Sequence, residues 1–157
     1  MIEPSMVKKL DFEVERLKRK YPPINIQTLD TLAREEFDAN VVRTPLGWMS
    51  KVVKSESGLF IFYYGSFKPY ESLALAHEIG HIVAGHLDGY NPGLEIKERE
   101  ADYFSAQIND VSLSKLNSFR FMEAVFRFKD DFRNIFRYGV EIAKLVEQDA
   151  YEAFKEV

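Results

Sequence analysis

All three histidines of this 157-residue chain lie within ten positions, at 77, 81 and 86, and the chain contains no cysteine. Helical patterning begins at Ser72 and continues through the first two of them. Residues four apart in a helix differ by about 40° around the axis, so His77 and His81 point the same way, one turn apart. Two such imidazoles can bind one metal ion, and any further ligand must be His, Asp or Glu.

Glu78 lies at the edge of this histidine face, about 100° from His77 around the helix axis. From there its carboxylate can reach a metal-bound water without ligating the metal. The pattern H-E-x-x-H is typical of zinc hydrolases, in which zinc lowers the pKa of its water to about 7 and the glutamate takes a proton as the water attacks a carbonyl group. The alternative is two histidines near a helix surface, satisfied by water and neighbouring carboxylates.

A catalytic zinc usually has three protein ligands and one open position, so one more ligand is needed. His86 lies about 180° from His77 around the axis and follows Gly85, where the helix can end. A ligand role for His86 on the same helix is therefore disfavoured. We interpret it as a surface histidine near a helix C-terminus.

A second predicted helix, which begins near residue 95, is the better source of a third ligand. Glu98 and Asp102 lie four residues apart on one face of it, together with small residues that suit close approach to another helix. If Glu98 ligates zinc, Asp102 can accept a hydrogen bond from a ligand histidine and fix its orientation, whereas Glu100 would point elsewhere. The same segment also fits a solvated, charged helix face.

The two segments together have a specific likeness. Residues 72–81 read SLALAHEIGH and residues 98–106 read EREADYFSA. They resemble the "lAHElGH" and "ExEAdxFA" helices of the ImmA/IrrE family of zinc metallopeptidases, over a region that runs mainly from Leu59 to Ile108. The resemblance implies a compact gluzincin-like, or zincin-like, fold with zinc (Zn2+) as cofactor. It assigns His77, His81 and Glu98 as zinc ligands, Glu78 as the general base, and Asp102 as the partner of a ligand histidine.

The resemblance also implies a function. Family members resemble site-specific proteases of bacteria, phages or mobile elements that inactivate a helix-turn-helix repressor. We therefore expect a zinc metalloendopeptidase whose protein substrate is such a repressor, and we expect the strand Leu59–Tyr64 to be an edge strand that pairs with the substrate. A zinc-stabilised, non-proteolytic binding module and a latent protease that awaits a signal are the alternatives.

Two segments depart from the family pattern and leave the identity of the substrate open. Residues 107–111 read QINDV where many relatives have an apolar "LLMP", and residues 67–72 read FKPYES where relatives often have arginines and an "FT" pair. Neither segment contains a proposed ligand.

The chain as a whole predicts one α+β domain that is mostly helical. We expect N-terminal helices in residues 1–40, a small antiparallel sheet in 41–70 next to the H-E-x-x-H helix, zinc-site helices in 71–110 and aromatic-rich helices in 111–157. The formal charge of -4 gives no general attraction to nucleic acid. The charged N-terminus has no apolar run for a signal peptide or membrane span, which favours a cytoplasmic protein.

Six phenylalanines alternate with basic residues between Ser118 and Tyr138. Such a mixture could serve nucleic acid or a protein partner, but its helical spacing favours packing on the catalytic unit, with the excess aromatic side chains available for a partner or dimer surface. These residues are Phe119, Phe121, Phe126, Phe128, Phe132 and Phe136.

Overall fold

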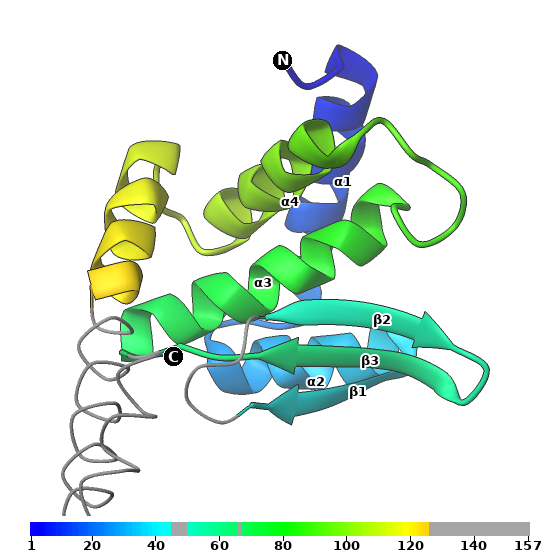
Figure 1. Cartoon of the computed structure of the whole chain (residues 1–157), viewed down its shortest axis with the longest axis horizontal. Coiled ribbons are helices and arrows are strands. Elements are labelled where there is room, and N and C mark those ends of the chain that lie inside the picture. The colour runs from blue at the N-terminus through cyan, green and yellow to red at the C-terminus, as the bar shows by residue number, and fades with distance from the viewer. Residues whose placement is uncertain (45–49, 66, 126–157) are drawn as a thin grey trace, which may run out of the picture. The chain divides into compact units, whose positions relative to one another are not determined.

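The computed structural model describes residues 1–44, 50–65 and 67–125, and the fold is reported for these residues. Contacts divide the chain into two units, Met1–Glu123 and Ala124–Val157, and all but the last two of the described residues belong to the first. The single domain predicted for the whole chain stays a prediction. The elements, in chain order, are α1 (Pro4–Lys20), α2 (Ile26–Phe37), β1 (Ala39–Arg43), β2 (Lys51–Ser55), β3 (Gly58–Tyr63), α3 (Lys68–Ala84) and α4 (Leu94–Ile108), shown in Figure 1.

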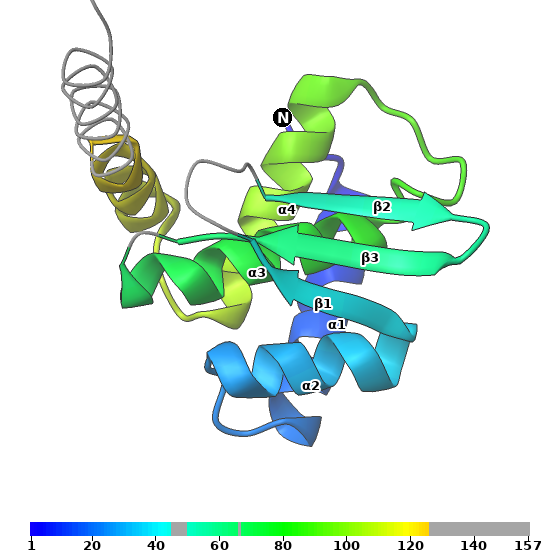
Figure 2. The same cartoon turned by 60° about the horizontal axis from the view of Figure 1, so that its bottom comes forward.

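The three strands form one mixed sheet in the order β1-β3-β2, as Figure 2 shows. β2 pairs antiparallel with β3, whereas β1 pairs parallel with it. The α+β prediction is confirmed, but the prediction of an antiparallel sheet is wrong for β1. A two-residue turn joins β2 to β3, which makes that pair antiparallel. β1 is followed in the chain by β2 but pairs with β3. The residue pattern within a strand does not reveal which strand becomes its neighbour or in which direction the two run.

The same topology overturns the expectation of an edge strand at residues 59–64. β3 lies between β1 and β2, so both of its edges are already paired. Among the described strands, β1 and β2 form the two outer edges of the sheet. Strand addition by a substrate would therefore have to use one of these two strands.

α3 is the central element of the fold and lies between the sheet and α4 (Figure 1). It contacts α1, α2 and α4 as well as β2 and β3, which explains why apolar residues cover most of its circumference. The fully buried side chains of the main core come from α1, α2, α3 and α4 and from β3. They include Leu10, Leu17, Leu29, Leu32, Ile61, Leu75, Ile79, Phe104 and Ile108.

Small residues let α3 and α4 approach closely. A Cβ atom added at Gly80 would lie 2.9 Å from the Cα atom and 3.0 Å from the carbonyl oxygen of Ala101. Near the other end of the contact, the Ser105 hydroxyl donates a 2.8 Å hydrogen bond to the Leu73 carbonyl. The face of small residues that was predicted for the helix beginning near residue 95, now α4, thus contacts Gly80 of α3.

Gly80→Ala tests this contact. In an exposed helix the change would stabilise the protein by about 0.5–1 kcal/mol through helix propensity. Here the new methyl group would press on the backbone of Ala101, so we expect a loss of about 1–3 kcal/mol in the free energy of unfolding. Urea denaturation measures the difference, and a stabilised variant would contradict the close approach.

Glu36 joins α2 to α1. Its side chain is 11 % exposed and pairs with Arg16 at 2.9 Å and with Lys20, and it accepts a 2.8 Å hydrogen bond from the Tyr21 hydroxyl. The bond from Lys20 is the largest influence and, with those from Arg16 and Tyr21, outweighs burial and lowers the pKa of Glu36 to about 2. A carboxyl group whose pKa is lower in the folded state stabilises the fold above its unfolded pKa.

We therefore expect Glu36→Gln to be destabilised relative to wild type by about 1 kcal/mol above about pH 5. The difference should shrink as the pH falls below 4.5, and it should vanish near 2, where the carboxyl group protonates in both states. Unfolding measured across this range tests the prediction. Glu15→Gln, which removes a 75 % exposed carboxylate of α1, serves as the control and should change little.

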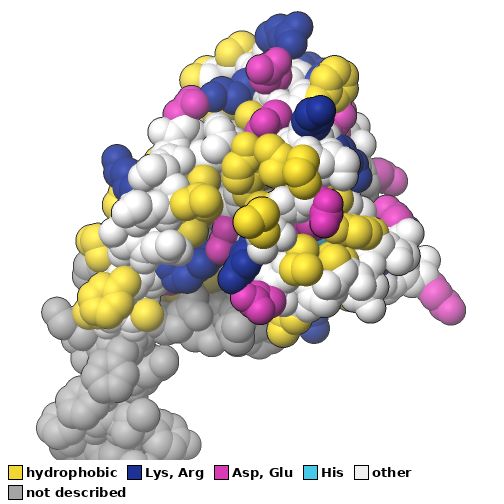
Figure 3. Space-filling model, turned by 90° about the horizontal axis from the view of Figure 1, so that it is seen from above, with side chains coloured by type: hydrophobic (Ala, Val, Ile, Leu, Met, Phe, Trp, Pro, Cys, Tyr) yellow, Lys and Arg dark blue, Asp and Glu magenta, His cyan; other side chains and the backbone are white. Residues whose placement is uncertain are grey.

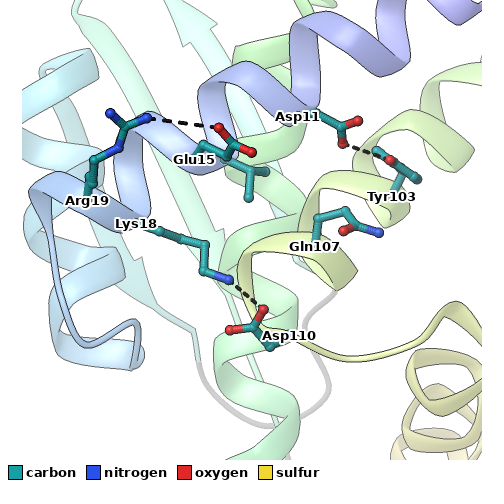
Figure 4. Close-up of a pocket in the computed structure, with 8 residues that line it drawn as sticks. Asp11, Glu15, Lys18, Arg19, Tyr103, Gln107 and Asp110 are labelled. Carbon is teal, nitrogen blue, oxygen red and sulfur yellow. Dashed lines mark hydrogen bonds and ion pairs between the residues drawn. The ribbon is translucent and has the colours of Figure 1, made fainter.

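A polar pocket lies between α1 and α4 (Figure 4). Its charged groups are paired: the Tyr103 hydroxyl donates a 2.7 Å hydrogen bond to Asp11, and Lys18 forms an ion pair with Asp110. On the face seen in Figure 3, hydrophobic side chains occur in groups separated by charged ones. No helix among the described residues has the length and apolarity needed to span a membrane.

The last described helix covers residues 113–125, within the region 111–157 for which helices were predicted. Ser112 precedes it, and its hydroxyl accepts a 3.1 Å hydrogen bond from the Lys115 amide, as an N-cap residue does. Phe119 packs edge-on against Phe67, in agreement with the packing interpretation, whereas Phe121 is 71 % exposed. Phe126, Phe128, Phe132 and Phe136 lie outside the described residues.

Candidate metal centre

Two elements bring three potential ligands together. His77 and His81 lie one turn apart on α3, and Glu98 faces them from α4. The Nε2 atoms of the two histidines are 3.2 Å apart. One Glu98 oxygen lies 3.3 Å from Nε2 of His77, and the other lies 3.5 Å from Nε2 of His81.

These spacings fit a zinc ion. In a tetrahedral site with bonds of about 2.0–2.1 Å, neighbouring ligand atoms are separated by about 3.3 Å. Two imidazole nitrogens and a carboxylate oxygen are also a donor set that zinc favours, and they leave a fourth position for reaction chemistry. The residues that the sequence analysis assigned as ligands are thus the ones that the fold brings within ligand distance of one another.

Asp102 orients His77. Its carboxylate accepts a 2.8 Å hydrogen bond from Nδ1 of His77, which leaves Nε2 facing His81 and Glu98. Arg120, from the helix at 113–125, binds both oxygens of Asp102, with Nη1 at 2.9 Å from one of them. The hydrogen bond that Asp102 accepts from a ligand histidine was expected from the sequence, but the contact with Arg120 was not, because no local pattern relates an arginine 18 positions away to this carboxylate.

His86 is buried, and its prediction as a surface residue is wrong. Its side chain is only 2 % exposed, and its Nδ1 atom lies 2.8 Å from Nδ1 of His81. α3 ends at Ala84, and Gly85 adopts the left-handed conformation with φ 89°. The Gly85 amide bonds to Ile82 and the His86 amide to His81, so the chain turns back over the last turn, where a helical projection no longer applies.

Glu100 points away from the three ligands, as expected, but it is not solvated. Its carboxylate is fully buried, accepts a 2.7 Å hydrogen bond from Nε2 of His86 and a 3.0 Å bond from the Tyr90 hydroxyl. The Tyr90 ring also stacks on His86. The interpretation of this helix face as merely solvated therefore fails at Glu100.

Glu78 is buried beside the three converging side chains. Burial raises its pKa to about 7, with a contribution from the charge of Glu98, while the charge of His77 and a hydrogen bond from the Val52 amide oppose the rise. This value lies in the range that suits a group exchanging protons at neutral pH.

The pKa values of His77 and His81 are shifted in opposite directions. Burial lowers the pKa of His77, but hydrogen bonds to Asp102 and Glu98 outweigh it and raise the value to about 9. Burial and the charge of His77 lower the pKa of His81 to about 4. The hydrogen bond from His77 also lowers the pKa of Glu98, and the acidic groups give this site a preference for a cation.

Two histidines and a glutamate beside a buried glutamate, on two packed helices next to a small sheet, define a metallopeptidase-like site. The sequence model of the M78 peptidases, described as the IrrE N-terminal-like domain, matches residues 34–141. Because this match covers more than half of the chain, the protein belongs to that metallopeptidase family. The resemblance to the ImmA/IrrE family is thereby confirmed. Searches of curated proteins and of solved structures found no significant match.

Glu98→Ala tests the third ligand. We expect the wild-type protein to bind one equivalent of zinc and the variant to bind it at least about 100-fold more weakly, because one of three protein ligands is lost. Chelator competition measures the affinity. Glu95→Ala removes an exposed carboxylate of the same helix and should leave it unchanged. Equal zinc binding by wild type and Glu98→Ala would exclude Glu98.

Proposed function

We propose that this protein is a zinc-dependent metalloendopeptidase in which His77, His81 and Glu98 hold the metal and Glu78 is the general base. The convergence of these three donors at tetrahedral spacing, with a buried carboxylate on the adjacent residue, is the observation that supports it best. A purely structural zinc would usually have four protein ligands and needs no neighbouring base.

Zinc bound by these side chains would supply the positive charge that acidifies water and polarises a peptide carbonyl. The remaining work falls to groups of this chain. Glu78 takes a proton from the attacking water and returns it to the leaving amine nitrogen. Asp102 holds the His77 ring through Nδ1, and Arg120 holds Asp102, so the Nε2 atom keeps its direction.

The free edge of β2 is the better candidate for binding an extended substrate. Ser55 and Gly58 flank the two-residue turn as a hydrogen-bonded pair, so Val52, three positions earlier, belongs to a non-hydrogen-bonded pair whose backbone groups face the open edge. The Val52 amide bonds to the Glu78 carboxylate. A peptide added along this edge would therefore pass directly beside the general base.

We further propose that the substrate is a helix-turn-helix transcriptional repressor in a bacterial, phage or mobile-element setting, and that cleavage takes place in the cytoplasm. This substrate class rests on the resemblance to the ImmA/IrrE family. The open edge of β2 is compatible with an unfolded or extended segment of such a repressor.

Glu78→Gln separates proteolysis from binding. Incubated with repressors encoded near its gene, the wild-type protein should produce defined fragments, detected by mass spectrometry. The variant should retain zinc and lose about 10²–10⁴-fold in cleavage rate, because a neutral amide cannot accept the proton. Glu71→Gln, another change on α3, controls for removal of a carboxylate.

Unchanged cleavage by Glu78→Gln would overturn the assigned mechanism. A repressor that binds the zinc-loaded protein without being cut under any inducing condition would instead favour the non-proteolytic binding module.

A further inference from the structure

His77 and His81 are held by different means. A carboxylate contacts His77 directly, whereas a second histidine stands between His81 and its carboxylate. We propose that His86 and Glu100 are positioning residues that set the proton arrangement of His81, so that its Nε2 atom is available to the metal. This inference rests on the proposed metal site and goes beyond it, since neither residue contacts the ligand atoms.

The chain of contacts is short and enclosed. Nδ1 of His81 lies 2.8 Å from Nδ1 of His86, and Nε2 of His86 lies 2.7 Å from the Glu100 carboxylate. His86 and Glu100 are 2 % and 0 % exposed, so water does not replace these bonds. The Tyr90 hydroxyl supplies the last bond, at 3.0 Å.

Only one arrangement of protons on His81 and His86 leaves the Nε2 atom of His81 able to bind a metal. Nε2 of His81 faces His77 and Glu98, so it must carry a lone pair, which places the ring proton on Nδ1. Nδ1 of His81 then donates to Nδ1 of His86, whose own proton must lie on Nε2. That proton is donated to Glu100, which accepts as a carboxylate.

The reverse arrangement would prevent metal binding. If Glu100 carried a proton and donated it to His86, both histidines would shift their protons, and Nε2 of His81 would become an N–H group. The Tyr90 hydroxyl donates to the other oxygen of Glu100, and such a bond is stronger to a carboxylate than to a neutral acid, so it favours the first arrangement. Glu100 and Tyr90 thus favour the arrangement in which His81 donates to His86 and His86 donates to Glu100.

Zinc affinity measured by chelator competition on the full chain tests the proposal. We expect His86→Leu to weaken binding by about 10–100-fold and Glu100→Gln by about tenfold, as for other residues that orient metal ligands. His86→Gln should lie close to wild type, because its amide oxygen can accept from His81 while its nitrogen donates to Glu100. Glu95→Gln removes an exposed carboxylate from the same helix and should have no effect.

We call the hydrogen-bonded series His81–His86–Glu100 the relay. Near-wild-type zinc binding by His86→Gln would distinguish the relay from a merely structural role of His86, which would depend on side-chain volume rather than on the direction of the hydrogen bonds. Thermal unfolding of each metal-free variant establishes that it is folded. Folded His86→Leu and Glu100→Gln variants that bind zinc as tightly as wild type would overturn the proposal.

Nitrogen-15 NMR of the zinc-loaded wild type needs no variant. We expect His86 to be protonated at Nε2 and His81 at Nδ1, and the opposite tautomer of His86 would overturn the relay. These measurements do not depend on cleavage. A protein that binds zinc but cuts no repressor would disprove the proposed function and leave the relay to be judged by affinity, whereas wild type without zinc binding would overturn both.

Discussion

The contact between α3 and α4 at Gly80 and Ala101 is the constraint on which the site depends. Because no side chain separates the two backbones there, Glu98 on α4 comes within 3.3–3.5 Å of the histidine nitrogens on α3. A larger residue at Gly80 would push the helices apart, and the short carboxylate side chain could not follow both histidines. Glu78 is buried beside β2, where the Val52 amide bonds to its carboxylate, and burial is the largest influence on its pKa.

Three acidic residues of α4, each two positions from the next, have three different environments. Glu98 is half exposed and faces both histidines, Asp102 is held between His77 and Arg120, and Glu100 is fully buried against His86. Helix geometry puts Glu98 and Asp102 on one face of α4 and Glu100 on the other. Glu100 nevertheless joins the site, because the turn at Gly85 brings His86 round to the far side of α4's first turns.

The sheet contributes through its edge. The antiparallel pairing of β2 with β3 leaves the backbone of Val52 directed outward, where it meets Glu78. The sequence indicated strands in this region but not their order, since patterning within a strand says nothing about its neighbours. The expectation that residues 59–64 form the edge was wrong for this reason, and the parallel partner β1 was likewise missed.

What the sequence determined by itself was local. The spacing of His77 and His81, the adjacent Glu78 and the pairing of Glu98 with Asp102 follow from helical periodicity, and the α+β class follows from the succession of patterns. Tertiary structure alone decided that His86 is buried and that Arg120 reaches Asp102, because a chain reversal after a helix and a contact between distant helices leave no periodic signal. Helical projection is valid only while the helix continues, and α3 ends one residue before Gly85.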